Sequence, residues 1–243
     1  CTESARGWLT RCGMEARVYT EDPLSANRMP SELQTDLREH KLKGLLTVQS
    51  LFAIRFMRSE FWRADPIPHV DIGSLEAPWR VYIDLGAFVQ DALALARADG
   101  RRRITVVAKG TGIGRQVLRR RLPGSDVEIY QRSDGPALAP EPWGFRAMLE
   151  MCSGASRPDA LICAGGTITK GVAQAALKMG LDVPDEMAII SLTNTGLELF
   201  YPVPIACFPF DIESMVVCAG ELLLRRINEP DLPPETILLP AEA

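Results

Sequence analysis

The sequence predicts an α/β protein built on parallel β-sheets, and the segment 158–194 gives the clearest indication. Residues 160–164 form an unbroken apolar run of strand length, which is typical of a parallel strand covered on both faces. A glycine-rich loop follows, and apolar residues then recur at helical spacing as far as Gly180, where a helix would stop. A proline turn and a second apolar run at 188–192 complete a strand–helix–strand unit.

The same alternation of strand and helix patterns runs along the rest of the chain and favours repeated βαβ units. Helices are expected at 3–12, 31–40, 52–63, 85–99, 113–122, 143–152 and 168–179. Strands are expected at 16–19, 44–48, 67–71, 104–108, 126–130, 160–164 and 188–192.

Length and composition fit a large folded core. The chain has 243 residues, of which 47% are hydrophobic, so it can bury a core in one domain or in two halves. No apolar run is long enough to cross a bilayer. The net charge is −4, and the short arginine clusters at 101–103, 119–121 and 225–226 are interpreted as solvated helix ends, because no strongly basic face accompanies them.

The six cysteines form no Cys-x-x-Cys pair and no Cys/His cluster, so no metal site is expected. Cys163 and Cys207 lie in apolar strand patterns, and Cys152 and Cys218 lie in helix patterns. Most of these side chains are therefore expected to be small buried thiols. Such usage fits a reducing cytoplasm.

The rim of a binding cleft can be located from the strand ends. In open α/β sheets, ligands bind beyond the carboxyl ends of the strands. This rule places Gly165 and Gly166, and then Thr193 and Asn194, at the rim.

Other candidate ligand-binding residues follow neighbouring strands. Gln49 and Ser50 end the strand at 44–48 and could line the rim. Asp71 and Asp84 are placed at strand ends where acids could face a cleft, although Asp84 could equally cap the helix that follows. Trp143 could stack on a ligand, or it could pack against the protein.

The loop at 109–114 has glycines at alternating positions between a predicted strand and a predicted helix. It could hold a phosphate on its backbone N–H groups. However, no Lys-Ser/Thr pair follows it, and it lacks the G-x-G-x-x-G spacing of dinucleotide folds. A tight turn between strand and helix is therefore the preferred interpretation.

Several motifs, taken in order, resemble one known family. PDALICAGG (158–166) is similar to the pattern PDAI-x-C-A-N-D, MGLDVPDEM (179–187) to LGL-x-VP-x-D, and IISLTN (189–194) to a strand ending G-F-D-D. Further matching segments are 44–50, 67–71, 84–104, 208–228 and 236–242. These patterns are those of the effector-binding core of the lactose-repressor/galactose-repressor family of bacterial transcription regulators.

The resemblance implies the periplasmic-binding-protein type I fold, with two Rossmann-like parallel-sheet subdomains joined by a three-stranded hinge. The first subdomain would contain residues 1–82 with 209–228, without the first strand that the fold normally has. The second would contain residues 83–208 with 229–243. The three crossings would lie near Val81, Cys207 and Glu229.

The resemblance also implies a function. The chain would be the ligand-sensing core of a cytoplasmic, homodimeric regulator that binds a small-molecule effector in a cleft between its lobes. DNA would be bound only through a domain absent from this chain, and no cofactor or membrane contact is expected. The family places a ligand-gripping arginine near the position of Arg115, which could equally be a surface arginine.

This chain departs from the family pattern at the cleft. Gly165-Gly166 stands where the family has Asn-Asp, and Thr193-Asn194 stands where it has Asp-Asp. Because each buried sugar hydroxyl needs a hydrogen-bond partner, the chain offers fewer side chains for a sugar than the family pattern does. The expectation is therefore that its effector is not an ordinary sugar, or that its cleft has lost ligand binding.

Two alternative functions belong to other classes. A periplasmic solute-binding protein that serves a transporter would share the fold. An enzyme that uses the cleft is disfavoured, because the sequence shows no G-x-S-x-G motif, no metal-ligand spacing and no cysteine–histidine pair.

Overall fold

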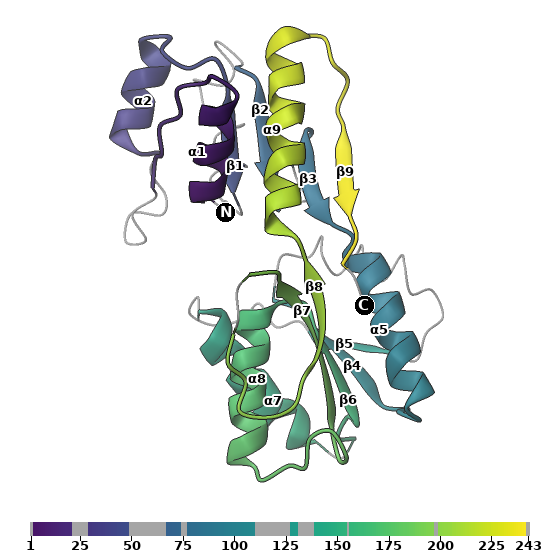
Figure 1. The fold of residues 1–243 in the computed structure, drawn as a ribbon. Helices are drawn as coiled ribbons and strands as arrows, with labels where there is room; N and C mark the ends of the chain where they lie inside the picture. The colour runs from purple at the N-terminus through teal and green to yellow at the C-terminus, as the bar shows by residue number, and fades with distance from the viewer. Residues whose placement is uncertain are drawn as a thin grey trace. The chain divides into compact units, whose positions relative to one another are not determined.

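The computed structural model describes residues 2–20, 29–48, 67–73, 77–109, 127–130, 139–154, 156–196 and 199–241. The chain forms two compact units (Figure 1). The first comprises Cys1–Ile83 and Ile212–Leu239, and the second comprises Asp84–Asp211 and Pro240–Ala243. The chain therefore passes between the units after Ile83, after Asp211 and after Leu239. No helix in the described ranges is long and apolar enough to span a membrane.

The first unit is built on a parallel sheet with the strand order β1-β2-β3-β9 in its described part. Its strands are β1 (Leu45–Val48), β2 (His69–Ile72), β3 (Arg80–Ile83) and β9 (Thr236–Leu239). Its described helices are α1 (Thr2–Arg11), α2 (Ser31–Arg38) and α9 (Ile212–Asn228). Helix α9 lies along the sheet, as Figure 1 shows, and buries one apolar stripe that includes Met215, Ala219 and Leu222.

The second unit contains another parallel sheet, with the order β5-β4-β6-β7-β8. Its strands are β4 (Ile104–Val107), β5 (Glu128–Tyr130), β6 (Ala160–Cys163), β7 (Ala188–Asn194) and β8 (Ala206–Phe210). Its described helices are α5 (Leu85–Ala98), α7 (Pro140–Cys152) and α8 (Gly166–Lys178). Two parallel-sheet units confirm the predicted α/β fold class.

The apolar patterns of the second unit predict its core well. Every residue of β4 and β6 is buried, as expected for central strands covered on both faces. In α8 the predicted apolar stripe from Ile168 to Ala176 is buried. Met179, the last residue of the predicted helix 168–179, lies beyond the last helical residue and is 37% exposed.

The last strand lies in a different unit from the one predicted. Residues 229–243 were assigned to the second subdomain, whereas β9 pairs with β3 of the first sheet, from Arg80 beside Thr236 to Ile83 beside Leu239. The third crossing consequently follows Leu239 and not Glu229. The physical reason is the short loop 229–235, which returns the chain directly to the sheet that α9 covers.

One predicted strand is absent. Residues 16–19 are in no strand, and the described segment 14–20 has no regular secondary structure. Side chains of this segment bind α2 instead of entering the sheet, as described below. The predicted helices at 52–63 and 113–122 lie outside the described residues.

The cysteines are less buried than predicted. Cys163 is fully buried in β6, but Cys207 is exposed on β8, which is an edge strand of the second sheet in its described part. Cys152 and Cys218 are partly exposed, and Cys12 is exposed. An apolar strand pattern at a sheet edge does not imply burial on both faces, and this explains the error at Cys207.

Helices α7 and α8 approach each other so closely that neither tolerates a side chain at the contact. A Cβ atom on Gly171 would lie 1.9 Å from the carbonyl oxygen of Glu141. A Cβ atom on Gly144 would lie 2.2 Å from the carbonyl oxygen of Ile168. Both distances are far below van der Waals contact, and the obstructing atoms belong to the backbone. The two glycines therefore fix the distance between the helices.

The substitution Gly171→Ala should destabilise the protein, because the new methyl group forces α7 and α8 apart. We expect a loss of about 1–3 kcal/mol in the free energy of unfolding, measured by urea titration. In contrast, Gly7→Ala in α1 should stabilise the protein by roughly 0.5–1 kcal/mol, since only the end of Arg11 lies near the new Cβ, at 3.7 Å. Equal effects of the two substitutions would contradict the close contact.

Candidate functional site

The carboxyl ends of β6 and β7 meet at one edge of the second sheet. The two strands are paired neighbours, with Cys163 beside Ser191. The turn after β6 carries Gly165 and Gly166, and β7 ends with Thr193 and Asn194. All four of these residues are partly exposed. The structure thus brings these four predicted site residues to one edge of one unit, and their role in ligand binding remains a prediction.

Buried hydroxyl groups lie directly behind this edge. Thr169 and Ser191 have no exposed surface, and their hydroxyl oxygens are 2.6 Å apart. The Thr169 hydroxyl also donates to the carbonyl oxygen of Gly165 at 3.0 Å. Tyr201, from the segment before β8, donates to the carbonyl oxygen of Gly166 at 3.3 Å. We call Thr169, Ser191 and Tyr201 the hydroxyl cluster.

The buried thiol beside this cluster is not a nucleophile at neutral pH. Burial raises the pKa of Cys163 to about 12, although a hydrogen bond with Thr169 opposes the shift. A thiol must lose its proton to attack a substrate or bind a metal. Cys163 is therefore a structural residue. Within the described ranges, no group of three or more His, Cys, Asp or Glu side chains is placed to hold a metal ion.

The two glycines at the edge have different surroundings. A Cβ atom on Gly165 would meet no atom within 4 Å. On Gly166 it would lie 2.8 Å from Leu199 Cδ1 and 3.0 Å from the hydroxyl oxygen of Tyr201. The space beside Gly166 is therefore already filled by this chain. Sequence reasoning missed Leu199 and Tyr201; the only available signal was an aromatic residue next to prolines shortly after a strand.

Asp84 and Trp143 have structural roles: Asp84 caps a helix, and Trp143 packs against the protein. The Asp84 carboxylate accepts a hydrogen bond from the backbone N–H of Ala87 at 2.9 Å and caps α5. Trp143 is 8% exposed and belongs to the core of the second unit, where its ring centroid is 5.8 Å from that of Tyr130. The predicted site residues Gln49, Ser50 and Arg115 lie outside the described part of the chain.

Asp71 lies inside a strand and not at a strand end as predicted, because β2 runs from His69 to Ile72. It has no exposed surface. The Thr47 hydroxyl donates to the Asp71 carboxylate and is 2.9 Å from Nε2 of His69. Since Thr47 has one proton to give, His69 donates through Nε2–H. The three side chains form a buried polar chain across β1 and β2.

The buried histidine of this chain is held neutral. Burial lowers the pKa of His69 from 6.5 to about 4, and the positive charge of Arg226 adds to the effect. A neutral imidazole with its proton on Nε2 is the form that can donate to Thr47. Burial therefore keeps the ring neutral, and the hydrogen bond to Thr47 places its proton on Nε2.

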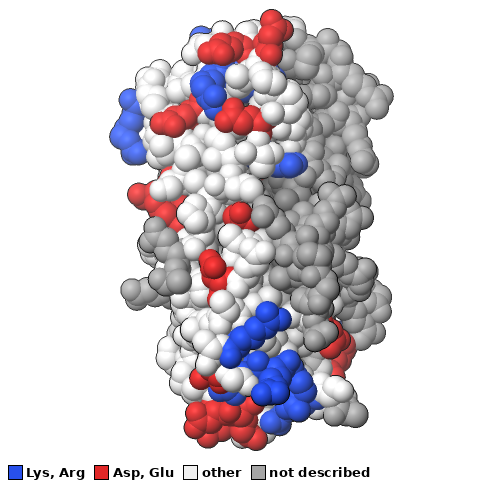
Figure 2. All heavy atoms as spheres, turned by 90° about the vertical axis from the view of Figure 1, so that its right-hand side faces the viewer, with Lys and Arg blue, Asp and Glu red and all other residues white. Residues whose placement is uncertain are grey.

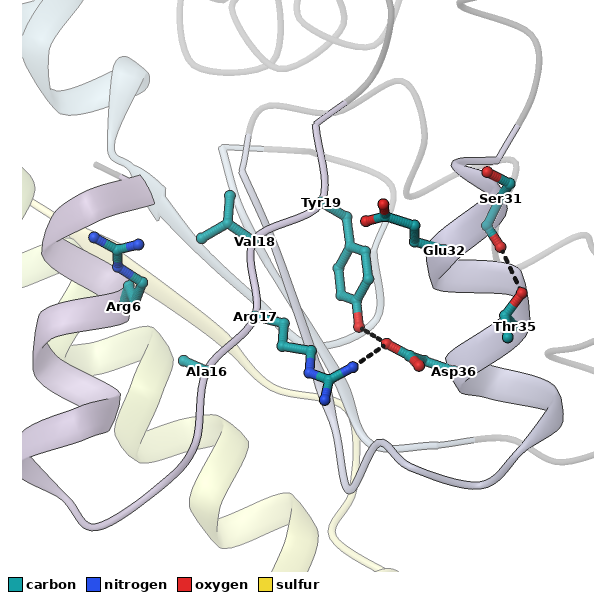
Figure 3. Close-up of a pocket in the computed structure, with 9 residues that line it drawn as sticks. All are labelled: Arg6, Ala16, Arg17, Val18, Tyr19, Ser31, Glu32, Thr35 and Asp36. Carbon is teal, nitrogen blue, oxygen red and sulfur yellow. Dashed lines mark hydrogen bonds and ion pairs between the residues drawn. The ribbon is translucent and has the colours of Figure 1, made fainter.

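An open hollow of about 610 Å³ in the first unit is lined by several side chains, among them Asp36 (Figure 3). Both oxygens of the Asp36 carboxylate have partners within the chain. Asp36 of α2 accepts hydrogen bonds from the Tyr19 hydroxyl at 2.6 Å and from Arg17 Nη1 at 3.0 Å. Lys41 Nζ lies 3.7 Å from its second oxygen. The hydrogen bond from Tyr19 is the main cause that lowers the Asp36 pKa, and Arg17 and Lys41 lower it further. Asp36 therefore attaches the segment 14–20 to α2.

A second cavity of about 710 Å³ lies between that segment and the sheet. It is lined by residues 13–20, by β1, and by side chains of α1 and α9 that include Leu9, Leu223 and Ile227. Its lining is mixed and contains no described cluster of converging charged groups. It offers less specific chemistry than the edge of the second sheet.

Arg101, which follows α5, is engaged in contacts within the chain. Arg101 donates to the carbonyl oxygens of Asp185 and Pro184, each at 2.8 Å, and to the Asp99 carboxylate at 2.8 Å. Figure 2 shows acidic side chains directly beside the basic ones near one end of the face it draws. This mixture favours the predicted helix-end role over a nucleic-acid surface.

Comparisons with known proteins point in one direction. Residues 97–243, more than half of the chain, match the sequence model of the periplasmic binding protein-like domain family. A 94-residue stretch is 30% identical to the HTH-type transcriptional repressor PurR of Escherichia coli, and a 95-residue stretch is 27% identical to the probable HTH-type transcriptional repressor ExuR of Bacillus subtilis. Each alignment covers 39% of this chain and only 28% of the relative.

Several solved structures share the fold at low sequence identity. A LacI transcriptional regulator from a Rhodococcus species has a TM-score of 0.78 at 16% identity, covering 99% of this chain and 89% of its own. A LacI family regulator from Enterococcus faecalis with bound ribose has a TM-score of 0.73 at 17% identity, covering 98% and 88%. A LacI family regulator from an Arthrobacter species in complex with lactose has a TM-score of 0.72 at 15% identity, covering 99% and 90%.

The buried histidine should make stability depend on pH. Between pH 6.5 and about 4 the unfolded chain binds a proton on His69 that the folded chain does not, so stability should fall as the pH is lowered through this window. His69→Gln should remove up to about 3 kcal/mol of this pH dependence. Urea unfolding across the window measures it. An unchanged slope in His69→Gln would refute the assignment.

The negative charge of Asp36 should affect the pKa of Tyr19 measurably. Burial and the hydrogen bond to Asp36 raise the pKa of Tyr19 to about 12. Asp36→Asn removes the negative charge but leaves the burial, so the Tyr19 pKa should move part of the way back toward 10.0. Nuclear magnetic resonance of labelled tyrosines reports each residue separately. Tyr82, whose pKa burial raises to about 12, is the control and should not change.

Proposed function

The chain belongs to the periplasmic binding protein-like domain family, as its motifs predicted, and we propose that it is the ligand-sensing core of a transcription regulator. The observation that carries this proposal is the similarity to two repressors of the HTH type. It favours a regulator over a solute-binding protein that serves a transporter. DNA binding is assigned to a domain outside these residues, since the aligned stretches span 28% of the relatives' length.

The proposed ligand is a small uncharged metabolite that carries hydroxyl groups. The E. faecalis and Arthrobacter neighbours hold ribose and lactose, respectively, which are molecules of this kind. In this chain, the proposed contact residues in the second unit are Gly165, Thr193 and Asn194, which offer backbone groups, a hydroxyl and an amide. Uncharged donors and acceptors suit the hydroxyl groups of a neutral ligand.

Binding without catalysis is the proposed activity. Ligand binding would favour one of two arrangements of the protein and pass that bias to the DNA-binding domain. The working form is proposed to be a homodimer in the cytoplasm, because a dimer matches paired half-sites on DNA. Neither a cofactor nor a membrane is required.

The proposal is tested by measuring ligand binding and DNA binding separately. Thermal unfolding of this chain with D-ribose, lactose and other neutral sugars should show a midpoint that rises with ligand concentration for at least one of them. The full-length protein should then bind its operator with an affinity that the same sugar changes. A sugar that binds but leaves DNA binding unchanged would support the transport alternative. No shift with any small molecule would refute ligand sensing.

The predicted contact at the end of β7 can be tested with a matched pair of variants. Asn194→Ala should weaken binding of the sugar found in this screen by roughly three- to tenfold, the effect of one hydrogen bond to an uncharged group. Asn228→Ala, at the exposed end of α9 in the first unit, should leave the affinity unchanged. Isothermal titration calorimetry gives both values, and equal affinities for the two variants would exclude Asn194 from the site.

A further inference from the structure

A segment distant in sequence fills the space beside Gly166, at the edge of the second sheet where the ligand is proposed to bind. We call this space the corner. Residues 199–205 run from the end of the β7 region to β8 and bring Leu199 and Tyr201 against Gly166. The Tyr201 oxygen lies 3.0 Å from the point where the first side-chain atom of residue 166 would stand. It therefore occupies the region that a longer side chain at position 166 would use.

The hydrogen bonds of this corner determine what the Tyr201 oxygen can still do. A phenol has one proton and two acceptor lone pairs. The proton is directed at the carbonyl oxygen of Gly166, 3.3 Å away. Ser191 lies close enough to this oxygen to lower the pKa of Tyr201. At least one lone pair remains, so this oxygen can accept a further hydrogen bond.

The corner carries no charge at neutral pH. Burial raises the pKa of Tyr201, so the phenol stays protonated. Thr169 and Ser191 are neutral, and burial keeps the nearby Cys163 thiol protonated as well. A charged ligand group placed here would find no opposite charge within the hydroxyl cluster and would lose its hydration. A neutral O–H group loses much less.

We propose that Tyr201 contacts the ligand and sets its specificity: its oxygen accepts a hydrogen bond from a hydroxyl group of an uncharged ligand. The inference rests on the proposed function and names the chemistry of that same site. Tyr201 is partly exposed, and Gly165, the residue before Gly166, faces open space. Gly166 has no side chain, and the Tyr201 hydroxyl supplies a polar group in the space that a side chain at this position would occupy.

The test compares two Tyr→Phe variants with the wild type. Tyr201→Phe removes the oxygen and keeps the ring that packs against Gly166. Tyr130→Phe removes the oxygen of another tyrosine in the same unit, which donates to Glu150 at 2.5 Å. Calorimetric titration with D-ribose and lactose should show about three- to tenfold weaker binding for Tyr201→Phe. Tyr130→Phe should bind as the wild type does.

A second substitution tests the position of the segment without any ligand. Gly166→Ala should push Leu199 and Tyr201 away and increase amide hydrogen exchange across residues 199–205. Gly154→Ala, whose new Cβ would meet only the Met151 carbonyl oxygen at 3.8 Å, should leave that exchange unchanged. Unchanged exchange in both variants would overturn the geometry on which the inference depends.

The outcomes separate this inference from the proposed function. If the wild type binds a neutral sugar and Tyr201→Phe binds it equally well, the inference fails and the proposed function stands. If a charged sugar acid binds more tightly than its neutral parent, the specificity assigned to Tyr201 is wrong. If the wild type binds no small molecule at all, both the inference about Tyr201 and the proposed function are wrong.

Discussion

The close contact between α7 and α8 is the constraint on which the geometry of the second unit depends. Gly144 and Gly171 remove the side chains that would otherwise separate the two helices. Helix α8 begins where β6 ends, so its position decides where Gly165, Gly166 and Thr169 stand relative to the strand ends. The positions of the polar residues at this edge thus depend on helix packing, because the close backbone contacts between α7 and α8 leave little room for movement.

The fold class was predictable because central parallel strands are covered on both faces. Such strands appear in the sequence as continuous apolar runs, and β6 and β7 were recognised in this way. The division into subdomains came from the family resemblance and placed β9 in the wrong unit, because no local pattern records which sheet a strand joins. At 16–19 the pattern resembled a strand, but Arg17 and Tyr19 find their partner in Asp36 and not in a neighbouring strand.

The candidate site was predictable only in part, for related reasons. The rule that ligands bind beyond strand ends located Gly165 and Thr193, because it depends on topology and not on individual contacts. Asp71 was misplaced because β2 extends one residue past it, which puts the carboxylate inside the strand. Tyr201 could not be found, since its proximity to Gly166 arises only when residues 35 positions apart are brought together by the fold.

The discontinuous first unit has a consequence for how the protein is made. Its sheet needs β9, which is synthesised only after Asp84–Asp211, the uninterrupted stretch that makes up nearly all of the second unit. The second unit can therefore form its core before the first unit has its full sheet. Domains usually fold in the order in which they are synthesised, and here that order is reversed. During translation, the edge of β3 that pairs with β9 is left open until both the second unit and α9 have been synthesised.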